Sequence, residues 1–235
     1  MRTVSEKLCP LESLTRLRQA AYRLFSQSLV YPDTERVETI GIVAGELARQ
    51  SEPWAGFAFF REWDLFLDAL AGLGPQQAAA LQGEYVSSFQ VSRPNVPCPI
   101  YESVYLAPEP AAAALLLAQL EIEYARAGLA ASSSPRQAPD HVAVELEFMS
   151  FLCAREAEFW EAEDIRQARQ FLKTERRFLR AHLNRWFPQF ACGVNALNPD
   201  GVFASATRAA GAFIVHDGDL IDGLLLRFDA VREAP

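Results

Sequence analysis

The stretch APDHVAVELEFMSFL, residues 138–152, holds polar residues whose types and spacing could do chemistry. Asp140 and His141 stand at the head of a helical apolar pattern, and Glu145 follows His141 four residues later. Pro139 suits the first turn of a helix, and Asp140 can accept backbone N–H groups at the positive end of the helix dipole. His141 should be neutral there, because an imidazolium is disfavoured at a helix N-terminus. The pattern predicts that Asp140 caps the helix and that the neutral imidazole of His141 can donate or accept a hydrogen bond.

Glu145 falls on the apolar side of this helix. At about 100° per residue it lies with His141, Phe148, Met149 and Leu152. A buried carboxylate must be paired or hydrogen-bonded to remain charged. We therefore expect Glu145 either to have a donor or cationic partner inside the protein or to line a recess. His141, at i, i+4, is one candidate partner.

A metal site is a second interpretation of the same residues. His141 and Glu145 could supply two ligands, and His182 is a candidate for the third, as in a helical metal-dependent hydrolase. No HExxH, paired acidic motif, nucleophile elbow or active-site Cys motif accompanies them. We therefore expect no metal, no cofactor and no catalytic role.

The proline-rich stretch at residues 93–110 is bracketed by aromatic side chains. Its prolines remove backbone donors and hold the chain extended, so it cannot be a regular helix throughout. Aromatic residues with polar tips suit a peptide-binding surface. The candidates are Tyr85, Phe89, Tyr101 and Tyr105, with Glu102 and Ser103 between the last two. Core packing is the alternative; it is favoured for Phe89 and stays open for Tyr101 and Tyr105.

Apolar residues recur at helical spacing almost everywhere, and no segment alternates convincingly as a strand would. The sequence predicts an all-α fold, with one globular domain over residues 1–235 built of roughly ten helices. The segment LAASSSPRQAP is a candidate hinge, with a possible lobe boundary near residues 130–139. Such a hinge would permit domain swapping, so a monomer and a swapped homodimer both stay open.

Three helix boundaries are specific enough to check. Gly128 is expected to end the helix that follows Pro110. Pro188 is expected to stop a helix that begins near Asp164. The tail is expected to hold two helical segments, at residues 204–213 and 219–232.

A basic stripe runs along residues 166–185, opposite an apolar face. We interpret it as a solvated face with local ion pairs to Glu163 and Glu175. A nucleic-acid surface around Arg176 and Arg177 is the alternative. The net charge of −8 argues against it, because such a surface needs cations to displace phosphate counterions.

Targeting signals are absent from the sequence. The beginning, MRTVSEKLCPLESL, is polar and has no apolar signal region, and the longest apolar runs fall short of the ~20 residues of a spanning helix. Cys9, Cys98, Cys153 and Cys192 form no C-x-x-C and indicate free thiols in a reducing compartment. We expect a cytoplasmic protein without membrane insertion.

The motifs above, taken together, resemble the TorD/DmsD/NarJ family of cytoplasmic chaperones for molybdenum enzymes. EYVSSF at residues 84–89 is similar to the family's aromatic-x-x-x-Phe helix, and PCPIYESVYL at 97–106 to its proline-containing loop. The Pro-Asp-His helix start at 139–141 and the segment FLRAHLNRWFPQF at 178–190 match two further motifs. The resemblance spans about residues 22–213.

The resemblance implies an all-helical chaperone that binds the twin-arginine signal peptide of a molybdopterin oxidoreductase subunit. It would hold the apoenzyme until the molybdopterin cofactor is inserted, and then release it for export. The implied peptide-binding residues are Tyr85, Phe89, Tyr101, Glu102, Ser103, Tyr105, Asp140 and His141. Glu145 joins them because arginine pairs with carboxylates and stacks on aromatic rings.

Two features depart from the family pattern. The loop has Tyr101-Glu102 where some members have Trp-Gly, and the acidic segment at residues 216–235 has no match. A relative that assembles a non-exported, nitrate-reductase-like subunit is therefore a further interpretation. The client enzyme, and direct binding of the molybdenum cofactor or a nucleotide, stay open.

Overall fold

The computed structural model describes residues 4–90, 95–129 and 137–233, with side chains for 11–90, 95–129 and 137–229. Ten α-helices occupy this part of the chain, which confirms the all-α prediction. They are α1 (Val4–Ser28), α2 (Thr34–Gln50), α3 (Phe60–Ala71), α4 (Ala78–Tyr85), α5 (Glu102–Leu106), α6 (Pro110–Arg126), α7 (Val142–Glu161), α8 (Ile165–Ala181), α9 (Leu183–Leu197) and α10 (Val202–Glu233). The predicted hinge lies almost wholly outside the described residues.

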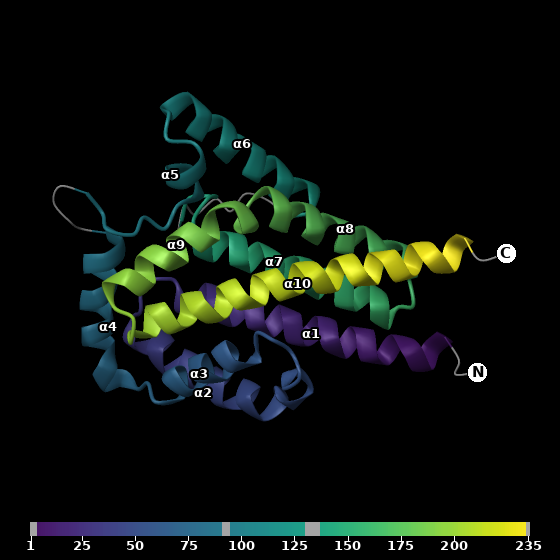
Figure 1. Ribbon diagram of the computed structural model, residues 1–235, viewed down its shortest axis with the longest axis horizontal. Helices are drawn as coiled ribbons and strands as arrows, with labels where there is room; N and C mark the ends of the chain where they lie inside the picture. Colours follow the sequence, from purple (N-terminus) through teal and green to yellow (C-terminus); the bar gives the residue numbers. More distant parts are fainter. Residues whose placement is uncertain (1–3, 91–94, 130–136, 234–235) are drawn as a thin grey trace.

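The core is built around α1 and α7, which pack along each other more extensively than any other pair of helices. Figure 1 shows α10 crossing the front of this pair, α2 and α3 below it, and α6 projecting at the top. Apolar faces of α3, α8, α9 and α10 complete the core. No described helix is long and apolar enough to cross a membrane.

Two of the expected helix boundaries were wrong. Pro188 lies inside α9, and the break comes earlier, at His182, where the backbone leaves helical geometry (φ −122°, ψ −92°). Asn184 and Pro188 are both exposed, so water can satisfy the carbonyl that the proline leaves without a partner. The tail is one continuous helix, because packing on α3, α8 and α9 outweighs the low helix propensity of its glycines. Gly128 ends α6 as expected, with φ +97°.

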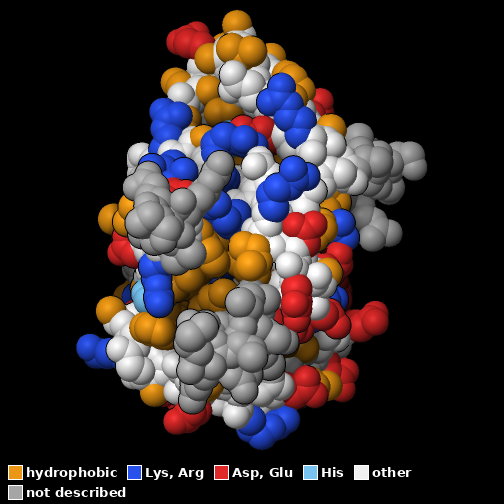
Figure 2. All heavy atoms as spheres, turned by 90° about the vertical axis from the view of Figure 1, so that its right-hand side faces the viewer, with side chains coloured by type: hydrophobic (Ala, Val, Ile, Leu, Met, Phe, Trp, Pro, Cys, Tyr) orange, Lys and Arg blue, Asp and Glu red, His pale blue; other side chains and the backbone are white. Residues whose placement is uncertain are grey.

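The basic stripe of α8 is paired with acids on distant helices. The ion pairs are Arg169 with Asp229, Arg176 and Arg180 with Asp222, and Arg177 with Glu123. The predicted local pairing with Glu175 was wrong, because Glu175 points into the core and bonds Arg18. Figure 2 shows Lys and Arg side chains below the hydrophobic side chains at the top of the molecule, where Figure 1 places α6.

A buried ion-pair hub joins four helices. Arg18 of α1, 1% exposed, bonds three carboxylates: Glu156 of α7 at 2.6 Å, Glu175 of α8, and Asp217 of α10. Tyr22 also donates to Asp217 at 2.8 Å. The acidic tail, which the resemblance left without a role, thus supplies a carboxylate to the centre of the fold.

Candidate functional site

The predicted loop and the start of α7 are joined by backbone hydrogen bonds. The amide of Val142 donates to the carbonyl of Ile100, and the amide of Glu102 donates to the carbonyl of Asp140, each at 2.9 Å. These bonds flank an antiparallel bridge between Tyr101 and His141. Motifs 40 residues apart in the sequence are therefore brought to one place, which we call the loop site.

The cap of α7 differs from the expectation. His141 is the capping residue, and its Nδ1 accepts the Ala143 amide at 3.1 Å. The Asp140 carboxylate accepts the Ser103 amide at 3.2 Å and so caps the neighbouring α5. Burial lowers the pKa of His141 to about 4, so the imidazole is neutral, as predicted.

Glu145 has its partner inside the protein, as expected, but the partner is not His141. The indole N–H of Trp186 on α9 donates to its Oε2 at 3.0 Å, while Oε1 has no partner among the described residues. Burial raises the pKa of Glu145 well above its ordinary value, and the neighbouring Glu102 carboxylate raises it further. Both effects favour the protonated form of Glu145.

A second buried pair ties α5 to the turn between α8 and α9. His182 Nδ1 lies 3.0 and 2.9 Å from the two carboxylate oxygens of Glu102, and Nε2 lies 3.8 Å from Glu123 of α6. Burial opposes the charge on His182, but hydrogen bonds to both carboxylates outweigh it and raise its pKa to about 9. An imidazolium therefore holds α5 and α6 to the bundle.

The predicted aromatic residues divide into two groups. Tyr85 and Phe89 are 2% and 3% exposed and pack against Phe203 in the core. Tyr101 is 37% exposed, and Tyr105 is half-buried, with its ring 5.4 Å from Trp186. Core packing is therefore confirmed for Phe89 and found for Tyr85, whereas Tyr101 and Tyr105 reach the surface of the loop site.

The carboxylates of the loop site are not accessible in this conformation. Glu102, Asp140 and Glu145 are 0–2% exposed, and each has a hydrogen-bond partner within the fold. Their observed role is to position the loop, and a guanidinium from solvent cannot reach them without opening it. Sequence reasoning missed the partners Trp186 and His182, because they lie on α9 and at the turn before it, distant in sequence from the residues that they bond.

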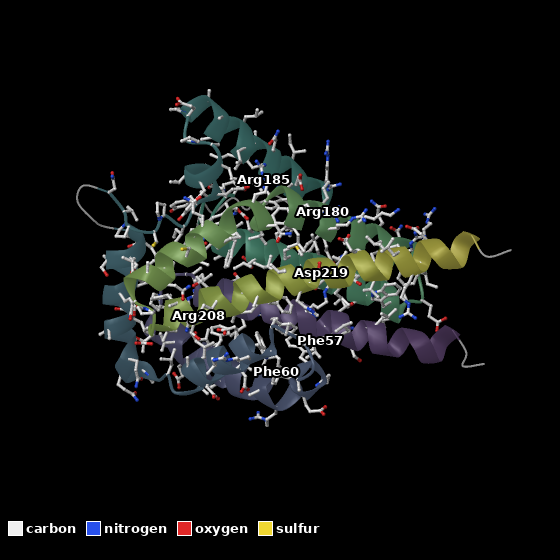
Figure 3. The ribbon with its side chains drawn as sticks, in the orientation of Figure 1. Phe57, Phe60, Arg180, Arg185, Arg208 and Asp219 are labelled. Atoms are coloured by element: carbon white, nitrogen blue, oxygen red, sulfur yellow. The ribbon has the colours of Figure 1, made fainter. Side chains whose placement is uncertain are left out.

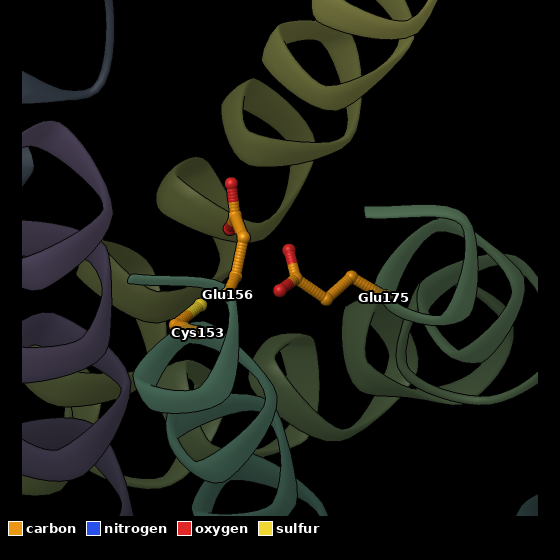
Figure 4. Close-up of side chains that lie close together, drawn as sticks. All are labelled: Cys153, Glu156 and Glu175. Atoms are coloured by element: carbon orange, nitrogen blue, oxygen red, sulfur yellow. The ribbon is translucent and has the colours of Figure 1, made fainter. Parts of the chain in front are cut away.

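The residues of the metal interpretation do not form one ligand set, because His141, Glu145 and His182 each bond a different partner. Among the described side chains, one group offers three ligand atoms within 4.8 Å of one another: Cys153, Glu156 and Glu175 (Figure 4). Arg18 already bonds both of its carboxylates. The donors therefore fit an ion-pair hub better than a metal centre.

Comparison with known proteins gives relatives of one kind. A family model described as nitrate reductase delta subunit matches residues 58–192. The chaperone protein TorD of Aeromonas salmonicida is 29% identical over 62% of this chain and 63% of its own length. The selenate reductase assembly chaperone protein of Thauera selenatis is 30% identical over 57% of this chain and 66% of its own length. The perchlorate reductase assembly chaperone protein of Dechloromonas aromatica is 27% identical over 55% of this chain and 56% of its own length. The chain spans less than two thirds of each relative.

Proposed function

Because the chain belongs to the nitrate reductase delta subunit family, we propose that it is a cytoplasmic maturation chaperone for a molybdopterin oxidoreductase. It binds the N-terminal twin-arginine signal peptide of the catalytic subunit and holds the apoenzyme until its cofactor is inserted, before export. The relatives named above are chaperones and assembly proteins, not catalysts. The same resemblance argues against the metal-dependent hydrolase.

The observation that carries the proposal is the convergence of the family motifs at the loop site. The loop around Tyr101, the start of α7 at Asp140 and the α9 residue Trp186 come together through a backbone bridge, a hydrogen bond and a ring contact. The exposed members, Tyr101 and Val104, offer aromatic and apolar contact area to a peptide. The buried acids keep this surface in place. We assign peptide contact to Tyr101, Ser103 and Tyr105 and a positioning role to the others.

The proposal is tested by co-expression with the molybdoenzyme subunits encoded beside the gene. A tagged chaperone should retain a client that carries its intact leader and lose one whose arginine pair is changed to glutamine. As a site test, the combined change Asp140→Ala and His141→Ala should release the leader while circular dichroism shows the helices intact. Unchanged retention by this folded variant would remove the loop site from the proposal.

The second candidate is a NarJ-like chaperone for a subunit that is assembled without export. The matching family model, described as nitrate reductase delta subunit, supports a nitrate-reductase-like client. In that case the chaperone should retain the client whether or not an arginine pair is intact, and deletion of the client's N-terminal segment should abolish retention. The two clients are thus separated by the same experiment.

A further inference from the structure

A groove lies on the other side of α9 from the loop site. It has a volume of about 330 Å³, within the usual range for ligand sites, and runs between α8, α9 and α10. Leu183 and Phe187 lie beneath it, and Val215, 61% exposed, stands on its rim. Helix α9 borders both the groove and the loop site, because Trp186 of the same helix packs on Tyr105.

Two glycines of α10 keep the groove open. Gly211 and Gly218 both line it, seven residues apart on one helix face. A Cβ on Gly211 would meet the Phe187 ring at 3.7 Å, and one on Gly218 would meet Asn184 at 3.9 Å, which are ordinary contacts. Alanine would therefore fit at either position and favour the helix. Packing within the fold therefore does not require glycine at either position, and the absence of both side chains leaves space in the groove.

The rim carries one acidic side chain that the fold leaves unpaired. Asp222 bridges the groove to Arg180 at 2.6 Å. Asp219, one turn earlier, has no ion-pair partner among the residues described. Figure 3 shows Asp219 between Arg180 and Phe57 on one face of the molecule. Phe57, 39% exposed, packs on His216 of α10 with ring centroids 4.6 Å apart.

We propose that this groove, with Asp219 on its rim and Phe57 beside it, binds the arginine-containing part of the client's leader. The inference rests on the proposed function. A guanidinium pairs with a carboxylate and stacks on an aromatic ring, and an adjacent apolar side chain fits beside Val215. The buried acids of the loop site cannot make this contact from solvent, whereas Asp219 can. Asp222 pairs with both Arg176 and Arg180, and together with Asp219 it balances their two positive charges, so the charged side chains that line the groove sum to zero.

The test uses the full chain and fluorescein-labelled peptides that carry an arginine pair followed by an apolar stretch, taken from neighbouring molybdoenzymes. Asp219→Asn should weaken binding about tenfold, the usual effect of losing a hydrogen bond to a charged group. Gly218→Leu, which fills the groove, should weaken it at least as much. Asp68→Asn and Gly223→Leu are matched controls, because Asp68 is exposed on α3 and a Cβ on Gly223 meets nothing within 4 Å. Thermal melts monitor the fold.

The outcomes separate the inference from the function on which it rests. Loss of binding in Asp219→Asn and Gly218→Leu, with both controls at wild-type affinity, supports the groove. Arginine-dependent binding that both variants retain overturns the groove and leaves the chaperone function standing. A wild-type protein that binds none of the peptides overturns both. In a reciprocal check, Asp219→Arg should bind a peptide with a glutamate pair better than one with an arginine pair.

Discussion

Changing His182 to glutamine removes the imidazolium whose ion pair with Glu102 ties α5 to the turn before α9. The pKa of His182 is raised from 6.5 to about 9, which corresponds to about 3 kcal/mol at 1.36 kcal/mol per pKa unit. Its side chain is 7% exposed, so solvent screening reduces this figure little.

The sign follows from proton uptake on folding. Below pH 6.5 both states hold the proton, and the stabilisation is complete. Between pH 6.5 and about 9 the unfolded state loses its proton first, so stability falls as pH rises. His182→Gln holds no ionisable proton, and its amide can still donate to Glu102. The variant should be less stable at pH 6.5 and should lack this decline.

The assay is urea unfolding followed by tryptophan fluorescence at pH 6.5, 7.5, 8.5 and 9.5, with a reductant present. The difference in free energy of unfolding between wild type and variant should shrink by about 3 kcal/mol across this range. His216→Gln is the matched control, because burial lowers the pKa of His216 and it titrates below the range. Wild-type and His182→Gln curves that run parallel from pH 6.5 to 9.5 would refute the charged pair.

Three further changes probe other parts of the account. Arg18→Met leaves three buried carboxylates without their guanidinium and should cost about 3–5 kcal/mol in urea unfolding; a loss under 1 kcal/mol would contradict the hub. Trp186→Phe removes the donor to Glu145 and should cost about 1–3 kcal/mol, and an unchanged midpoint would show that the bond contributes nothing. Gly128→Ala places a side chain at φ +97° and should lower stability by about 1–3 kcal/mol, whereas Gly45→Ala, where a Cβ meets nothing, should not.

The fold class was readable from the sequence because helical periodicity is a local property. The end of α6 is an example: the helix runs to Arg126, and Gly128 follows with φ +97°, as predicted. The helix end at Pro188 and the break in the tail were predicted wrongly because tertiary packing determines whether these helices continue. Local helix propensity carries no information on that packing. The family was predicted correctly because the motifs occur in the same order along the chain as in the TorD/DmsD/NarJ family, although each motif alone is weak evidence.

The candidate site was predictable as a set of residues and not as a set of contacts. Asp140 and His141 do lie beside the loop at Tyr101, yet the hydrogen-bond partner of the buried Glu145 comes from α9, which is distant in sequence. Arg18 lies four residues after Leu14 and three before Ala21, within an apolar stripe, and this position was the missed signal for the hub.

The most direct test of the central claim is a calorimetric titration of the purified protein with synthetic leaders of the molybdoenzymes encoded beside it. The account predicts saturable binding at one peptide per chain, weakened at least tenfold when the arginine pair is replaced by glutamine. Equal heats for the arginine and glutamine leaders, or no heat with any of them, would contradict it.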